Sequence, residues 1–297
     1  MFKPISEFNL FELSRRINRP LILDGAMGSL LQQKGVKAET NLWMSLTNIN
    51  RPKKVLSIHK EYIKAGSDII TTNTFRTNPA ALKGTKHNLN KLVKASVNLA
   101  LEAANDLPVL VAGSNPPAED CYQVKRTISK KELDLNHKEH ISKLMEYGSH
   151  FILNETQSHL DEIKIISKFC SKNKIPFIIS LFFNQRLRIL SGESLEDVIN
   201  FILEYNPLAI GFNCILPSLM NIAMKRLKFN VNWGLYLNCG DGSYTDEDIK
   251  CGISPEDYLV EIKKHLTKKP SFIGSCCGSS PYHINKIKEY LDGRTHS

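Results

Sequence analysis

The chain has 297 residues, of which 42% are hydrophobic and 23% are charged. These values are typical of a globular protein, and they exclude the disordered, fibrous and low-complexity classes. The formal net charge is +9. Because the lysines are scattered along the chain and no aromatic residues alternate with them, we expect a basic surface and no nucleic-acid partner.

The amino-terminal segment from Met1 to Phe8 carries early charges and no sustained apolar run. We therefore expect neither a signal peptide nor a membrane span, and a cytoplasmic location. The seven cysteines are an odd number, which fits free thiols in a reducing compartment better than a disulfide framework. No linker-like stretch divides the chain, so residues 1–297 are predicted to form a single domain.

Eight short apolar runs recur along the chain, and each one is a predicted buried strand. They are residues 21–24, 68–72, 108–112, 150–154, 176–181, 208–212, 233–237 and 271–274. The segments between them have helical spacing, and helix starts are indicated at Ser194, Ser254 and Ser280. Eight strands alternating with helices predict an α/β fold, a (β/α)8 TIM barrel. An open doubly wound sheet has the same periodicity and is the alternative.

Polar residues follow many of these strands. They are Asp24-Gly25, Thr72-Asn73-Thr74, Glu155-Thr156, Asn213-Cys214, Asn238-Cys239-Gly240 and Cys276-Cys277. In a barrel the carboxyl ends of the strands meet at one mouth, which carries the active site. Three thiols delivered there would form a soft metal site, and zinc suits it because three thiolates leave a fourth tetrahedral position open. The alternative is that these cysteines pack as small hydrophobic residues.

Several motifs, taken in their order along the chain, resemble the homocysteine S-methyltransferase family. They are Leu23-Asp24-Gly25-Ala26-Met27-Gly28, Trp43 followed by His59 and Tyr62, Ala65-Gly66-Ser67-Asp68, Thr72-Asn73-Thr74-Phe75, Glu155-Thr156, Gly211-Phe212-Asn213-Cys214 and Gly274-Ser275-Cys276-Cys277-Gly278. The family includes betaine-dependent and S-methylmethionine-dependent enzymes and the homocysteine module of cobalamin-dependent methionine synthase. The resemblance runs from Leu21 to Ile284, and it implies a zinc-containing barrel that methylates the sulfur of homocysteine.

The resemblance also implies roles for single residues. Cys214, Cys276 and Cys277 take the positions of the zinc ligands, and the nucleophile is the substrate thiolate. Asp24 and Glu155 are expected to bind the ammonium of homocysteine, and the turn Gly25-Ala26-Met27 its carboxylate. A helix cap for Asp24 and a surface ion pair for Glu155 are the structural alternatives.

Two asparagines and a fourth cysteine lie beside these ligands. Asn213 and Asn238 are placed with the substrate, and Asn238 either orients homocysteine, occupies the vacant metal position or serves as a turn residue. Cys239 stands where the family more often has alanine. It either competes for zinc or, as we favour, packs as a hydrophobic residue.

The methyl donor is expected to carry a positive charge, which aromatic faces bind. Trp43 and Phe75 are the candidates, with Phe182 and Phe183 as further neighbours or core residues, and Arg76 suits a donor carboxylate. Betaine, dimethylsulfoniopropionate and S-methylmethionine all stay open, and the segment 113–117 departs from the family's glycine-rich loop. A folate- or cobalamin-dependent system with a partner protein, and a noncatalytic zinc- or thiol-binding sensor, are the alternatives. The oligomeric state is not indicated.

Overall fold

A computed structural model of the chain describes residues 10–38, 42–227, 231–242 and 248–295. All eight predicted strands are present. They are β1 Leu21–Ile22, β2 Ile69–Thr71, β3 Leu110–Asn115, β4 Phe151–Gln157, β5 Phe177–Leu181, β6 Ala209–Asn213, β7 Trp233–Leu237 and β10 Phe272–Ser275. They pair in parallel in the order β1-β10-β7-β6-β5-β4-β3-β2, and a parallel bridge between Leu23 and Ile69 joins the two ends. The sheet closes, so the (β/α)8 barrel prediction is confirmed.

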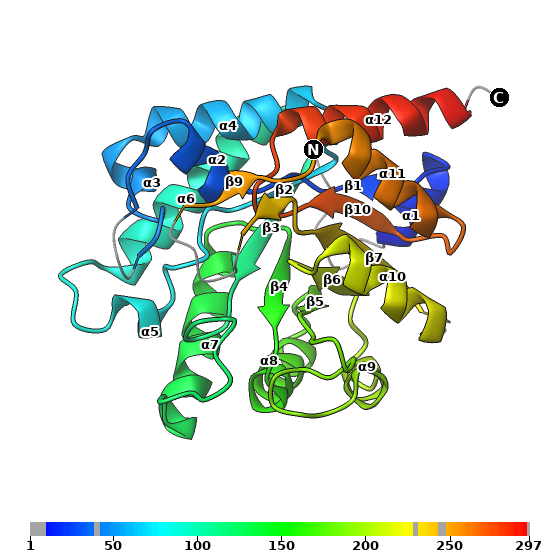
Figure 1. Cartoon of the computed structure of the whole chain (residues 1–297). Helices are drawn as coiled ribbons and strands as arrows, with labels where there is room; N and C mark the ends of the chain where they lie inside the picture. The colour runs from blue at the N-terminus through cyan, green and yellow to red at the C-terminus, as the bar shows by residue number, and fades with distance from the viewer. Residues whose placement is uncertain (1–9, 39–41, 228–230, 243–247, 296–297) are drawn as a thin grey trace.

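Helices surround this barrel (Figure 1). They are α1 Leu10–Arg16, α2 Met27–Gln33, α3 Thr47–Asn50, α4 Pro52–Lys64, α5 Pro79–Leu82, α6 Leu89–Ala104, α7 Lys130–Glu146, α8 Leu160–Lys172, α9 Leu195–Leu203, α10 Pro217–Arg226, α11 Pro255–Leu266 and α12 Pro281–Thr295. The described helices include none that is long and apolar enough to cross a membrane.

The predicted helix starts are confirmed. Ser194 caps α9 by accepting a hydrogen bond from the Asp197 N–H, and Ser254 caps α11 in the same way. The third start, at Ser280, is followed directly by α12. Each cap satisfies an N–H group that the first turn of a helix leaves without a partner.

The core has two layers. Side chains from alternate strand positions fill the barrel interior, among them Leu21, Leu110, Phe151 and Phe272. A larger cluster of buried apolar residues lies between the sheet and the helices. The interior is therefore packed, as in other barrels of this kind, and open space is left to the mouth.

Two strands run further than the sequence indicated. β3 continues to Asn115 and β4 to Gln157, so Glu155 lies within a strand rather than after it. β4 shifts its register between Asn154 and Gln157, and Thr156 has a positive φ of 55°. The Asn213 side chain accepts from the Thr156 N–H and donates to its hydroxyl, both at 2.8 Å. The Asn213 side chain therefore gives Thr156 hydrogen bonds at the point where the pairing of β4 with β5 is interrupted.

A short hairpin was not predicted. Strands β8 (Gly240–Asp241) and β9 (Lys250–Cys251) pair antiparallel after β7. Two residues per strand are too few to produce a periodic signal. The hairpin adds Gly240 and Asp241 to the wall of the mouth.

Candidate active site

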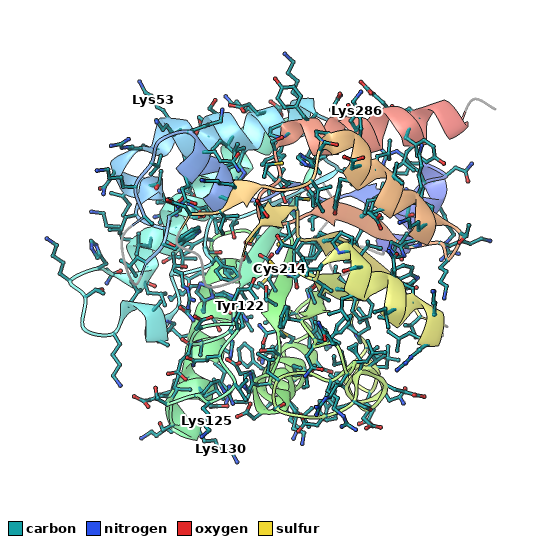
Figure 2. The ribbon with its side chains drawn as sticks, viewed as in Figure 1. Lys53, Tyr122, Lys125, Lys130, Cys214 and Lys286 are labelled. Carbon is teal, nitrogen blue, oxygen red and sulfur yellow. The ribbon has the colours of Figure 1, made fainter. Side chains whose placement is uncertain are left out.

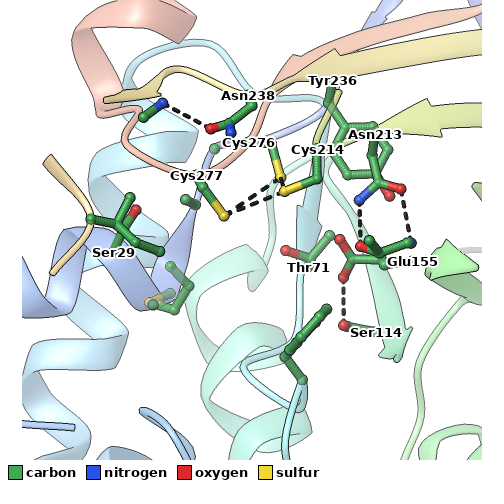
Figure 3. A pocket seen from close by; sticks show the side chains of 18 of the residues that line it. Ser29, Thr71, Ser114, Glu155, Asn213, Cys214, Tyr236, Asn238, Cys276 and Cys277 are labelled. Carbon is green, nitrogen blue, oxygen red and sulfur yellow. Dashed lines mark hydrogen bonds between the residues drawn. The ribbon is translucent and has the colours of Figure 1, made fainter. Parts of the chain in front are cut away.

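A cavity of about 290 Å³ opens at the carboxyl ends of the strands. Figure 3 shows part of its lining. The thirteen residues that the sequence assigned to the metal, to homocysteine or to the donor all line it: Asp24, Gly25, Ala26, Met27, Trp43, Phe75, Arg76, Glu155, Asn213, Cys214, Asn238, Cys276 and Cys277. Segments as far apart as the first and last strands are therefore brought to one place.

Three thiols converge at this cavity. The Sγ atom of Cys214 lies 3.1 Å from that of Cys276 and 3.5 Å from that of Cys277, and the last two sulfurs are 4.0 Å apart. Among the described residues, this is the cluster of His, Cys, Asp and Glu side chains that can hold a metal ion. The prediction that strands six and eight deliver three thiols to one point is confirmed in its geometry.

The backbone around the thiols is held in specific conformations. Cys214 has a φ of 57°, which turns its side chain into the cavity directly after β6. Gly278, after the paired cysteines, has a φ of 82°, and a Cβ atom there would lie 2.5 Å from the Cα of Gly240. Only glycine fits such a position without displacing the neighbouring chain.

The three thiols form hydrogen bonds with one another. Hydrogen bonds from Cys276 and then Cys277 hold the pKa of Cys214 well below its usual value, and the same bonds raise the pKa of the two donors. The Tyr122 hydroxyl also donates to the Cys214 sulfur, at 3.1 Å. A negative charge is thus favoured on Cys214, in the middle of the cluster.

Asp24 is buried and does not cap a helix. Its carboxylate accepts from the Thr71 N–H at 2.8 Å and from the Thr71 hydroxyl at 3.1 Å, whereas α2 begins after Ala26 without a side-chain cap. Burial raises the pKa of Asp24 well above its ordinary value. The helix-cap alternative is therefore wrong, and the carboxylate faces the cavity.

Glu155 is half-buried in the wall of the cavity and does not lie on the outer surface. It lines the cavity, and its Oε1 atom accepts a hydrogen bond of 2.5 Å from the Ser114 hydroxyl. Burial raises the pKa of Glu155 to about 7. Within the described ranges it forms no ion pair with a lysine or arginine, so the surface ion-pair alternative is not supported.

The turn Gly25-Ala26-Met27 lies at the edge of the cavity. The Ala26 N–H donates to the Ser279 hydroxyl at 3.2 Å. A Cβ atom on Gly25 would lie 2.6 Å from the same hydroxyl oxygen. One of the amides expected to bind a carboxylate therefore has a protein partner, which a ligand would have to share or displace.

The two asparagines are engaged with the backbone. Asn213 braces Thr156, as described above, and Asn238 accepts from the Gly240 N–H at 2.8 Å. Asn238 therefore serves as a turn residue here, with its side chain at the cavity. Cys239 is fully buried in the core, outside the thiol cluster, in agreement with packing as a hydrophobic residue.

The expected donor side contains an indole, a phenyl ring and a guanidinium. Trp43, Phe75 and Arg76 line the cavity together. Arg76 lies 5.7 Å from the centre of the Phe75 ring and donates one N–H to the carbonyl of Glu119. Phe182 and Phe183 are buried and do not line the cavity, so the core alternative holds for both.

Sequence reasoning missed residues that follow or end β3. Ser114 binds Glu155, and Asp120, Cys121 and Tyr122 line the cavity from the β3–α7 loop. Their position after a strand was a usable signal, because everything after a barrel strand borders the mouth. Figure 2 shows Tyr122 and Cys214 near the middle of the molecule, with the labelled lysines at its periphery.

Fold and site together define a class, a closed (β/α)8 barrel with a three-thiol centre at its mouth. The profile of the homocysteine S-methyltransferase family matches residues 21–291. The chain therefore belongs to the homocysteine S-methyltransferase family, a family of methyltransferases that act on the homocysteine sulfur.

The sequences of individual relatives align with nearly the whole of this chain. Homocysteine S-methyltransferase YbgG of Bacillus subtilis (strain 168) is 25% identical over 296 residues, which cover 90% of this chain and 93% of the relative. Homocysteine S-methyltransferase of Escherichia coli (strain K12) is 24% identical, with coverages of 90% and 94%. The crystal structure of the homocysteine methyltransferase MmuM from Escherichia coli, metallated form, matches with a TM-score of 0.79 at 22% identity. The match covers 95% of this chain and 100% of the MmuM chain, which supports the barrel fold.

Proposed function

We propose that this chain is a zinc-dependent enzyme that transfers a methyl group from a small onium donor to homocysteine, giving methionine. Cys214, Cys276 and Cys277 are the proposed zinc ligands. The observation that carries the proposal is the meeting of these sulfurs, all within 4.0 Å of one another. The same cavity is lined by Asp24 and Glu155, two carboxylates that form no ion pair with a lysine or arginine among the described residues. We also propose that residues 1–297 act as one domain.

The thiols fit a zinc ion in spacing and in chemistry. Zinc–sulfur bonds of about 2.3 Å in a tetrahedral arrangement place sulfurs about 3.8 Å apart. The separations of 3.1, 3.5 and 4.0 Å bracket that spacing. Thiolates are soft ligands that select zinc over the hard cations, and three of them leave one position for a substrate. The metallated form of the MmuM structure, which has a similar fold, is consistent with such a site.

Homocysteine is proposed to bind with its amino-acid end away from the thiols. Asp24 and Glu155 offer carboxylates to its ammonium, and the Gly25-Ala26-Met27 turn offers backbone N–H groups to its carboxylate. Asn213 and Asn238 shape the space between. Bound zinc would lower the pKa of the homocysteine thiol, so that the thiolate is present at neutral pH.

The transfer itself requires alignment more than acid or base catalysis. The thiolate sulfur attacks the methyl carbon while the bond from that carbon to the donor nitrogen or sulfur breaks, and the electron pair leaves with the donor. The positive charge of the onium is neutralised in the same step, so the leaving group needs no proton. The chain's role is to hold the two substrates in line.

The donor is proposed to lie against Trp43 and Phe75, with Arg76 near its carboxylate. Betaine, dimethylsulfoniopropionate and S-methylmethionine each have an onium centre and a carboxylate. Two further carboxylates, Asp120 and Asp241, stand at the exposed rim of the cavity. This acidic rim favours S-methylmethionine, because that donor carries an ammonium in addition to its sulfonium.

The test is to measure zinc content and methionine formation together. The purified protein should retain about one zinc ion per chain and form methionine from homocysteine with at least one of the three donors. Cys276→Ala should lose both the metal and turnover. Full turnover by this variant would refute the assignment of the ligands.

The same assay separates the alternatives. A sensor barrel would bind zinc and homocysteine but form no methionine from any onium donor. A component of a folate- or cobalamin-dependent system would act only when a protein carrying the methylated cofactor is added. Membership in a methyltransferase family favours the catalytic hypothesis over the sensor.

A further inference from the structure

The β3–α7 loop, residues 116–129, places a tyrosine hydroxyl on the thiol cluster. Tyr122 donates to the sulfur of Cys214 at 3.1 Å. The tyrosine ring packs edge-on against Phe182, with ring centroids 5.1 Å apart. Among the described residues, the three sulfurs form side-chain hydrogen bonds to one another and to Tyr122. The contact between Tyr122 and Cys214 joins two segments 92 residues apart in the sequence.

Hydrogen bonds from side chains outside the loop hold the backbone of the loop that carries Tyr122. Asn78 donates to the carbonyls of Pro117 and Ala118, at 3.1 and 3.2 Å. The buried carboxylate of Glu162 accepts from the Ala118 N–H at 2.7 Å. Two proline residues at 116 and 117 restrict the backbone further. The loop therefore has little freedom to move relative to the barrel.

The same carboxylate is held by a histidine and an arginine. Glu162 lies 3.0 Å from His137 Nε2 and 3.1 Å from Arg126 Nη1. Before Tyr122 in the chain, the Ser158 hydroxyl donates to the carbonyl of Cys121 at 3.1 Å. After Tyr122, the His159 Nε2 atom donates to the carbonyl of Val124, also at 3.1 Å. With both flanks fixed, the position of the hydroxyl on the sulfur is a built feature of the fold.

Charge explains what such a hydrogen bond does. Three thiolates and one zinc ion carry a net charge of −1, and the thiolate of homocysteine would bring it to −2 in a buried place. An O–H donor directed at one sulfur stabilises this excess negative charge. Outer-shell hydrogen bonds of this kind orient a ligand and increase its hold on the metal.

We propose that Tyr122 is a positioning residue of the metal centre, whose hydroxyl fixes the Cys214 sulfur and strengthens zinc binding. This inference rests on the proposed zinc site. It assigns a function to the loop that begins with Pro116 and Pro117 after β3.

The experiment compares Tyr122→Phe with the unmodified protein. This change removes the hydroxyl and keeps the ring against Phe182. The zinc affinity, measured by competition with a chromophoric chelator, should fall by about 10- to 100-fold. With Co²⁺ in place of zinc, the thiolate-to-metal charge-transfer bands should shift, because one sulfur has lost its hydrogen bond. Both readouts are independent of turnover.

Tyr205→Phe is the matched control. Tyr205 precedes β6, at the opposite end of the strand from Cys214, so its hydroxyl should affect neither affinity nor spectrum. If Tyr122→Phe keeps the affinity within about twofold and leaves the Co²⁺ bands in place, the tyrosine only fills space and the inference is wrong. If the unmodified protein binds no zinc, the proposed metal site fails first, and this inference falls with it. Thermal melting confirms that each variant is folded.

Discussion

The two ends of the barrel differ in how they treat acidic side chains. At the amino-terminal end, Asp68 forms an ion pair with Arg19, whose Nη1 and Nη2 atoms lie 2.6 and 3.0 Å from its carboxylate oxygens. At the mouth, Asp24 and Glu155 accept hydrogen bonds only from neutral groups within the described ranges. The ion pair of Asp68 stabilises the fold. Asp24 and Glu155 have no charged partner, so their burial lowers the stability of the folded protein, and they are available to the cation of a ligand.

We expect the largest effect from Glu155→Gln, at the mouth of the barrel. The substitution removes the charge and keeps the volume, so homocysteine should lose one charged hydrogen bond, worth about 1.5–3 kcal/mol. We expect kcat/KM for homocysteine to fall by about 10- to 100-fold while the zinc content stays unchanged. Steady-state kinetics and metal analysis on one preparation check this. Loss of zinc with normal use of homocysteine would move Glu155 to the metal site.

The same substitution should stabilise the substrate-free protein at alkaline pH. Burial raises the pKa of Glu155 from 4.5 to about 7, so between these values the folded protein binds more protons than the unfolded one. Its stability therefore falls as pH rises through this window, by about 2–3 kcal/mol in total. Glu155→Gln should flatten that fall, and denaturant unfolding at pH 5 and pH 8 measures it. Parallel pH profiles for the two proteins would mean that Glu155 is not the group responsible.

Asp68→Asn tests the opposite end of the barrel. Breaking this partly exposed pair should cost about 2 kcal/mol of stability, less than a fully buried pair, because solvent already screens it. The KM for homocysteine should not change. Urea unfolding together with kinetics decides the matter, and a specific loss of substrate affinity without destabilisation would contradict the division between the two ends.

Trp43→Ala should give the smallest effect. Loss of one cation–π contact, about 0.5–2 kcal/mol, should raise the KM of the donor more than that of homocysteine. Arg76→Ala should harm donors that carry a carboxylate, and serves as the comparison. A collapsed melting curve for Trp43→Ala, with no selective donor defect, would place the indole in the core instead.

The sequence was sufficient for the barrel because each strand is a short apolar run between helical segments. It was also sufficient for the thiol cluster, since Cys214 and the pair Cys276-Cys277 follow strands that end at one mouth. It did not locate Tyr122, because the β3–α7 loop has no periodicity and is anchored by side chains distant in the sequence, such as Asn78 and Glu162.

The ends of β3 and β4 were missed for a related reason. Ser114 and Glu155 look like loop residues in a sequence, since polar residues usually end a buried strand. Inside the barrel mouth they remain in the sheet because they hydrogen-bond to each other across neighbouring strands. Contacts between strands, which depend on register, are not visible in either strand alone.

The proposed function depends on three cysteines that hold zinc and leave one position for the substrate sulfur. X-ray absorption at the zinc edge, recorded with and without homocysteine, tests it most directly. We expect three sulfur neighbours at about 2.3 Å plus one lighter atom in the free protein, and a fourth sulfur in place of that atom once homocysteine is added. Fewer than three sulfurs in the free protein, or an unchanged spectrum with saturating homocysteine, would contradict the claim.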